Sequence, residues 1–272
     1  MASRGYNRYS QLRSGNDTEL ELCSIGDSDT PIISLTSPES SEFVEITNGS
    51  IINFSVYYRQ RWVLNYSAIT AITSTEKIIN ALRGPDGLPT TLDQASYEHI
   101  VNPLNDGSPR NLPRLFVLES HGNIASICDG EPPIVTIVPM ETKLENCLGK
   151  VTVRPLITGI PQSITDAIID NYLGRPYAKE IVEQLIWTIQ YRNSPKAYRR
   201  IACVFRSDFV TMVFTRYGIL PPDTNIVDTD PEWYDSLSEL DKVSDYTTNE
   251  RTLKQPPVKR YTVGCARKCD VA

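Results

Sequence analysis

The sequence predicts an α+β fold: a mixed or antiparallel sheet with an N-terminal β-hairpin and C-terminal helices, and flexible tails at both ends. Three observations favour this class. Short apolar stretches rich in β-branched residues come first, stretches of helical period come later, and the two kinds do not alternate regularly. With 272 residues, of which 40% are hydrophobic and 22% charged, the chain can bury a substantial core.

The N-terminal hairpin is predicted at residues 43–58. Residues 43–47 and 50–58 are rich in β-branched and aromatic side chains, and Asn48-Gly49 separates them. Asn-Gly suits a two-residue type I′ turn, because both central residues of that turn have positive φ. The two stretches are therefore expected to pair with each other.

The first helix is predicted to begin near Ser74, since Thr73 and Glu76 have the spacing of a capping box, and to end before Gly84-Pro85. Loops that contain Gly, Pro or Asn follow and separate three further apolar stretches. These stretches are predicted to form strands at residues 114–119, 134–138 and 151–157.

Helices are predicted again in the second half of the domain. One covers residues 163–173 and is closed by Gly174, and the next begins near Pro176 and has a continuous apolar face. Residues 201–217 fit either a strand or a helix. Pro221-Pro222 is expected to close the folded part.

Charges are sorted into blocks at the C-terminal end of the chain. Between residues 221 and 250 nine acids stand against one base, Lys242, whereas residues 251–268 hold six bases and no acid. Such blocks are typical of interaction segments. We therefore divide the chain into a flexible polar arm (1–42), a globular α+β domain (43–220), an acidic linker (221–250) and a basic, cysteine-containing tail (251–272).

Composition limits the class of protein. The formal net charge of −6 disfavours general coating of nucleic acid, which needs a basic footprint. No apolar run approaches the roughly 18 residues that cross a bilayer, and the polar N-terminus lacks the apolar core of a signal peptide. We expect a cytoplasmic protein, peripheral to a membrane or part of a virion. No phosphate-binding or metal-binding signature stands in the sequence, so no cofactor and no metal site are predicted.

The strongest catalytic candidate is His121. The apolar stretch 115–119 ends in Ser120-His121-Gly122 and resembles the segment of caspase-type cysteine proteases in which the catalytic His follows a strand. In that family the next strand ends in Gln-Ala-Cys, which supplies the nucleophile, but the matching residues 158–163 contain no Cys. Cys128 or Cys147 would have to reach His121 to be activated. We assign no catalytic residue and keep a cysteine hydrolase as an alternative.

Partner contacts are predicted in the basic tail, where bases can bind anionic lipid while an acylated cysteine adds a second anchor. The membrane-binding or partner-binding candidates are Arg251, Lys254, Lys259, Arg260, Arg267 and Lys268, and the acylation candidates are Cys265 and Cys269. A second basic face comprises Arg192, Lys196, Arg199 and Arg200. The tail can equally fold back onto the acidic linker. In the arm, Tyr9-Ser10-Gln11-Leu12 fits a Tyr-x-x-apolar peptide that a protein partner would bind.

These features predict a non-enzymatic structural or assembly protein that acts through self-association and peripheral contact with a membrane or protein partner. A flexible arm, an α+β domain and charged extensions form a plan similar to that of matrix-type proteins of enveloped RNA viruses. The alternative from another class is a nucleic-acid-associated capsid or regulatory protein. It would use the basic helix that ends at Arg200.

Overall fold

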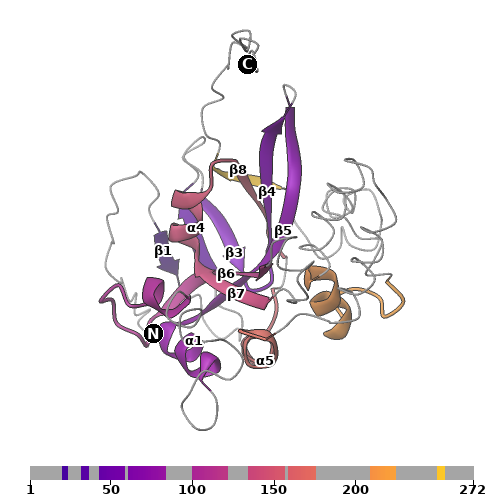
Figure 1. The fold of residues 1–272 in the computed structure, drawn as a ribbon. Coiled ribbons are helices and arrows are strands. Elements are labelled where there is room, and N and C mark those ends of the chain that lie inside the picture. Colours follow the sequence, from indigo (N-terminus) through magenta and orange to yellow (C-terminus); the bar gives the residue numbers. More distant parts are fainter. Residues whose placement is uncertain are drawn as a thin grey trace, which may run out of the picture.

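The computed structural model describes residues 20–23, 32–36, 43–58, 61–83, 100–121, 134–156, 159–175, 209–224 and 250–254. Strands in these residues form two antiparallel sheets, one of three strands and one of six, and helices pack beside them (Figure 1). The prediction of an α+β fold with an antiparallel sheet is confirmed. The outer parts of both predicted tails lie outside the described residues.

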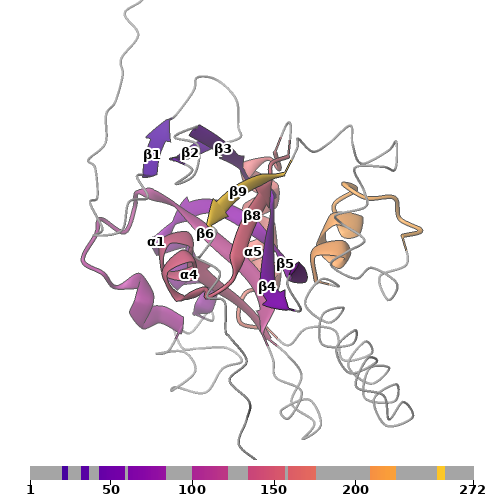
Figure 2. The same cartoon turned by 90° about the horizontal axis from the view of Figure 1, so that it is seen from above.

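The two sheets use the strands in different orders. The smaller sheet follows the sequence, with the order β1 (Leu20–Cys23), β2 (Ile32–Thr36) and β3 (Phe43–Thr47). The larger sheet has the spatial order β7 (Ile134–Pro139), β6 (Pro113–His121), β5 (Arg61–Ser74), β4 (Ile51–Tyr58), β8 (Lys150–Arg154) and β9 (Arg251–Lys254). Figure 2 shows β9 alongside β8, at the edge of this sheet.

Both faces of the six-stranded sheet are covered. The helices are α1 (Thr75–Leu82), the 3-10 helix η1 (Asn102–Leu104), α4 (Met140–Asn146), α5 (Gln162–Tyr172) and a helical segment at 209–216. Neighbouring residues of β4 point to opposite faces, so Ile51 lies in one core and Ile52 in the other. The first core packs against α1, α5 and the 209–216 segment, and the second against α4 and the three-stranded sheet.

The Asn48-Gly49 turn forms, but the predicted hairpin across it is wrong. Gly49 has φ +82°, and the Ser50 amide donates to the Thr47 carbonyl at 3.1 Å. However, β3 pairs with β2, whereas β4 pairs with β5 and β8. The turn is tied to β5 instead, because the Gly49 amide donates to the Thr70 carbonyl at 2.9 Å. The chain therefore crosses from the smaller sheet to the larger one at this turn.

Most other predicted elements are confirmed. The strands at 114–119, 134–138 and 151–157 correspond to β6, β7 and β8, although β8 ends at Arg154. α5 covers the helix predicted at 163–173, Gly174 has φ +72°, and residues 209–216 are helical. α1 begins as predicted, but its cap is Ser74, whose Oγ accepts a bond from the Lys77 amide at 3.1 Å. The cap is thus one residue later than the predicted capping box, because Ser74 is the last extended residue before the helix.

Two segments that the composition assigns to flexible ends are strands in the structure. β1 and β2 lie within the predicted arm 1–42, where short apolar stretches pair in the smaller sheet and Ile33 is buried. β9 lies beyond Pro221-Pro222 and opens the predicted basic tail, yet it belongs to the larger sheet. Its Leu253 is 3% exposed and packs in the second core with Val151 and Val153. That burial explains why the folded part extends past residue 220.

The helix predicted from Pro176 and the second basic face (Arg192, Lys196, Arg199 and Arg200) lie outside the described residues. The same holds for Tyr9-Ser10-Gln11-Leu12. Among the helices that the structure describes, none has the length and apolar character needed to cross a membrane.

Candidate functional site

The β4–β5 hairpin projects beyond the rest of the six-stranded sheet (Figure 1). β4 pairs with β8 only as far as Ser55, and the residues that follow pair with β5 alone. The register shifts between Phe54 and Ser55, whose partners are Tyr66 and Leu64, so Asn65 is an extra residue on β5. Such a bulge increases the local twist and bends the strands away from the sheet.

The loop between α4 and β8 lies against the base of this hairpin. A Cβ atom on Gly149 would lie closer than 3.0 Å to the carbonyl oxygen of Ser55, so only glycine allows the two backbones to approach in this way. The β4–β8 register ends with Ser55 opposite Lys150. Continuing that register past the strand ends sets Tyr57 opposite Leu148, which brings the loop and the hairpin to one end of the sheet.

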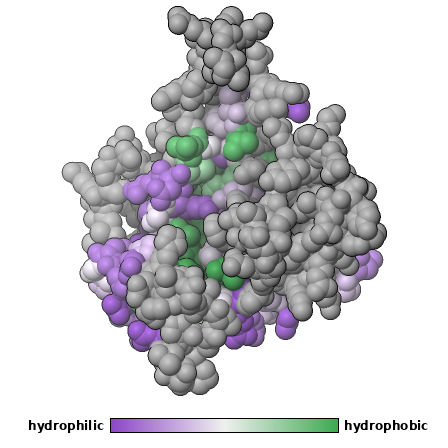
Figure 3. All heavy atoms as spheres, in the orientation of Figure 1, coloured by the Kyte–Doolittle hydropathy of each residue, from purple (hydrophilic) through white to green (hydrophobic). Residues whose placement is uncertain are grey.

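Large hydrophobic side chains are exposed at this end. In the described part of the chain, the exposed ones are Leu148 (93% exposed), Val56 (47%) and Tyr57 (44%). The ring of half-buried Trp62 packs edge-on against that of Tyr57, with centroids 5.3 Å apart, as expected for a cross-strand pair. We call these four residues the apolar end. Figure 3 shows hydrophobic residues at the surface near the middle of one face, with hydrophilic residues beside them.

Charged residues flank the apolar end. Arg61, at the outer end of the hairpin, is exposed and pairs with Tyr58, and half-buried Lys150 pairs with Ser55. The nearest acid in sequence is Glu145 on α4, which is also exposed. The described rim thus carries more positive than negative charge.

β9 leads the predicted basic tail to this same end. β9 is antiparallel to β8, with Arg251 opposite Val153 and Lys254 opposite Val151. The chain therefore leaves β9 next to Lys150, the residue that follows the exposed loop. Of the predicted contact residues, Lys254 is brought to the apolar end, whereas Arg251 lies at the opposite end of β9. Lys259, Arg260, Arg267 and Lys268, with Cys265 and Cys269, lie outside the described residues.

An ion pair fixes α4, and with it the start of the exposed loop, on the sheet. Lys143 Nζ of α4 lies 2.5 Å from Glu119 Oε1 of β6, and the Glu119 side chain is only 6% exposed. The same Nζ lies over the rings of Phe54 and Tyr66, 5.1 and 5.3 Å from their centroids, and the two rings stack at 4.5 Å. The ammonium thus has a carboxylate and two aromatic faces as partners, each of which stabilises a cation.

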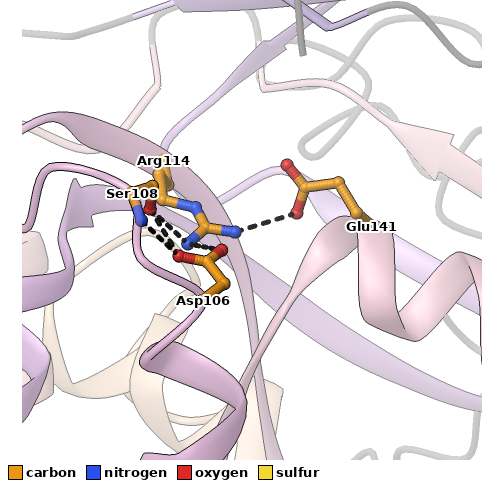
Figure 4. A network of polar contacts seen from close by, with 4 residues as sticks. All are labelled: Asp106, Ser108, Arg114 and Glu141. Atoms are coloured by element: carbon orange, nitrogen blue, oxygen red, sulfur yellow. Dashed lines mark hydrogen bonds and ion pairs between the residues drawn. The ribbon is translucent and has the colours of Figure 1, made fainter. Parts of the chain in front are cut away.

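A second polar cluster holds the first turn of α4 (Figure 4). Arg114 of β6 donates to Asp106 Oδ2 at 2.6 Å and lies 4.0 Å from Glu141 Oε2. Burial raises the pKa of Glu141, and the attraction of Arg114 offsets this only in part. Burial also acts to raise the pKa of Asp106, but hydrogen bonds from Ser108 and attraction to Arg114 outweigh it, so this pKa is lowered. The cluster joins loop 105–112 to β6 and α4.

The catalytic candidates are not brought together by any contact of the described residues. His121 ends β6 and pairs with Ile134 of β7. Cys147 is half-buried after α4, and its Sγ lies 3.8 Å from the carbonyl oxygen of Gly149. Cys128 lies outside the described residues. Within the described ranges, no group of three or more His, Cys, Asp and Glu side chains could hold a metal ion.

The sequence alone does not reveal the apolar end. Val56 and Tyr57 belong to the strand predicted at residues 50–58, and apolar residues in strands are ordinarily buried. Leu148 stands between Cys147 and Gly149, where nothing local distinguishes an exposed leucine from a core one.

Comparisons of the chain with protein-family models, with curated proteins and with solved structures give no match.

Proposed function

We propose that this chain is a non-enzymatic structural protein that associates with copies of itself and contacts the anionic surface of a membrane through the apolar end and the basic tail. The observation that carries the proposal is the direction of β9. It delivers the start of the tail, at Lys254, to the end of the sheet where Leu148 and Tyr57 are exposed. Apolar insertion and charge attraction would then act at one place.

The two contributions are individually small and add up. A leucine side chain that leaves water contributes about 1.5–3 kcal/mol. Tyr and Trp are suited to the membrane–water interface, where the ring meets apolar chains and the polar group stays wet. Each base near an anionic surface contributes roughly 1 kcal/mol. Stable peripheral binding ordinarily needs two such signals, and this end of the molecule supplies both.

The protein would thus act at the cytoplasmic face of a membrane or beneath the envelope of a virion, as matrix-type proteins do. The described polar clusters support a structural role. Arg114 through Glu141, and Lys143 through Glu119, each join α4 to the sheet and so hold the exposed loop in place.

Vesicle sedimentation of the full chain tests this function. We expect the chain to sediment with vesicles that contain phosphatidylserine and to stay in solution with phosphatidylcholine alone, and we expect added salt to weaken sedimentation. Light scattering should show a mass that rises with protein concentration. A strict monomer that ignores both kinds of vesicle contradicts the proposal.

A further inference from the structure

The outer edge of β8 is built to receive a strand. β9 fills it with four residues, and Leu253 enters the second core between residues of β8. Without β9, the backbone groups along β8 would lose their partners and part of this core would be open to water. An unfilled edge of this kind pairs readily with other chains.

A polar socket beside the edge fixes the position of the incoming strand. Glu250 Oε1 accepts hydrogen bonds from Thr152 Oγ1 at 2.5 Å and from Asn53 Nδ2 at 3.0 Å. Asn53 is completely buried, and its Oδ1 accepts a bond from Ser67 Oγ at 2.7 Å. The carboxylate thus has two donors, on β8 and β4, and Ser67 of β5 holds the Asn53 amide in place from the next strand. The socket accepts a carboxylate that lies just before a short strand.

We infer that, when copies of the chain associate, the outer edge of β8 and the polar socket beside it are filled by residues 250–254 of a second copy. The inference rests on the self-association part of the proposed function and names its mechanism, an exchange of β9 between protomers. Every contact just described is made by residues 250–254, so a neighbour's segment supplies the same bonds as the chain's own. Exchange of identical elements is a low-cost route to oligomers for this reason.

The partner is a second copy of the chain because the edge of β8 and its polar socket match residues 250–254 residue by residue. The carboxylate, the buried leucine and the paired register all belong to one stretch of this sequence. Residues 225–249 separate β9 from the preceding described segment, and an extended chain spans about 3.4 Å per residue, which is enough to reach a neighbouring sheet. A β9–β9 contact between outer edges is less suitable, because antiparallel pairing would set Arg251 against Lys254.

Exchange would also link assembly to membrane contact. A β9 that docks on a neighbour leaves that sheet at the neighbour's apolar end, so the basic tail of one protomer would extend the membrane surface of the next. Reciprocal exchange closes a dimer, whereas one-directional exchange forms an open row.

Cysteine cross-linking separates exchange from folding within one chain. Thr152 and Thr252 are partners in the β8–β9 ladder, and Cα atoms of such partners lie about 4.5–5.5 Å apart, within reach of a disulfide. Chains carrying T152C are co-expressed with chains carrying T252C, oxidised with oxidised glutathione and run on a non-reducing gel. We expect a band of twice the chain mass. T252C co-expressed with T136C, on the opposite edge strand β7, is the matched control and should give no such band.

The double variant T152C/T252C shows that the disulfide can form, and the pair V151C with K254C repeats the test one register position away. If the double variant forms its disulfide only within one chain, while the mixed chains oligomerise without cross-linking, strand exchange is overturned and self-association stands. If light scattering finds only monomers at every concentration and on anionic vesicles, self-association itself fails.

Discussion

Gly49 lies so close to Ile160 that a Cβ atom on Gly49 would come within 3.0 Å of two atoms of the Ile160 side chain. The two residues are also joined through the backbone next to them, because the Ile160 amide donates to the Asn48 carbonyl at 2.8 Å. The crossing between the two sheets is therefore held by a segment that follows β8, more than a hundred residues later in the sequence.

Replacing Gly49 by Ala should destabilise the protein strongly. The new methyl group would overlap buried Ile160, and alanine would also have to adopt φ +82°. Overpacking in a core costs about 1–3 kcal/mol, and the left-handed backbone about 1–2 kcal/mol more. Urea unfolding of the variant should therefore show a loss of roughly 3 kcal/mol.

Gly107→Ala is the matched control for this experiment. Gly107 has the same φ of +82°, but no atom lies within 4 Å of the position that its Cβ would occupy. Its free energy of unfolding should fall only by the cost of placing alanine in the left-handed backbone region, about 1 kcal/mol. Equal losses in the two variants would mean that Ile160 does not confine Gly49.

Removing the ammonium of Lys143 should destabilise the attachment of α4. In Lys143→Met, the carboxylate of Glu119 stays buried but loses its ion-pair partner, which typically costs about 3 kcal/mol. Urea unfolding at neutral pH measures this cost. Because the double variant Glu119→Gln/Lys143→Met leaves no buried charge there, it should recover most of the loss. A double variant that is as unstable as the sum of the single ones would show that the two groups act independently.

The turn at Asn48-Gly49 shows how far the sequence alone could lead. The local signal was right, since Gly49 does have positive φ, but a turn motif does not specify which strands pair beyond it. β4 pairs with β5 and β8, and Gly49 packs against Ile160, so the partners come from distant parts of the sequence. Apolar stretches between loop residues located β6, β7 and β8, because each of these strands is largely buried, and Gly174 marked the end of α5.

β9 and the apolar end could not be predicted for a different reason. Arg251 and Lys254 flank the two inner residues of β9, Thr252 and Leu253. The charged residues therefore made this stretch resemble the rest of the basic tail. Leu253 is buried because it packs against Val151 and Val153 of β8, which lies far away in the sequence. Similarly, Leu148 is exposed in a loop that approaches the hairpin closely at Gly149 and Ser55, which no local pattern reveals.

Replacing Glu141 by Gln should stabilise the protein at neutral pH. Burial raises the pKa of Glu141 above its value in the unfolded chain, so the ionised carboxylate opposes folding. This opposition is absent well below pH 4.5, where the group is protonated in both states, and it grows as the pH rises through the folded pKa. Urea unfolding should thus show wild type and variant converging at acid pH and the variant more stable at pH 7.

The opposite sign is expected at the other carboxylate of the same cluster. The pKa of Asp106 is lowered, so its ionised form favours folding above its ordinary pKa of 3.8 and this contribution is lost as the pH falls through the folded pKa. Asp106→Asn should therefore be destabilised at pH 7 and approach wild type in acid. If both variants shift stability in the same direction at pH 7, the electrostatic account of the cluster is wrong.

Glu250→Ala should loosen β9 without unfolding the domain. Asn53 and Thr152 would lose their shared acceptor, and a buried donor without a partner costs about 1–3 kcal/mol. Hydrogen exchange at the β9 amides should accelerate by a factor of roughly 10 or more, while β5 and β6 keep their protection. Asp223→Ala, at an exposed acid outside the sheet, is the control and should leave β9 unchanged. Faster exchange throughout the sheet would mean that β9 is an integral part of the fold and not a separable strand.

Apolar insertion and charge attraction can be separated by changing the apolar end and the tail one at a time. Leu148→Ser removes the most exposed apolar side chain and should weaken binding to phosphatidylserine vesicles about tenfold at any ionic strength, since this term is apolar. A chain that stops after Lys254 keeps β9 but loses the tail, and its remaining binding should depend much less on salt. The two changes should be additive in free energy, because insertion and charge attraction involve different atoms.

The base near the tip of the hairpin should also contribute to binding. Arg61→Ser should weaken binding to the vesicles, whereas the control Arg110→Ser, at an exposed base in loop 105–112, should not. If Leu148→Ser binds as wild type does while the truncated chain does not bind, the membrane is held by the tail alone, and the apolar end must serve another contact.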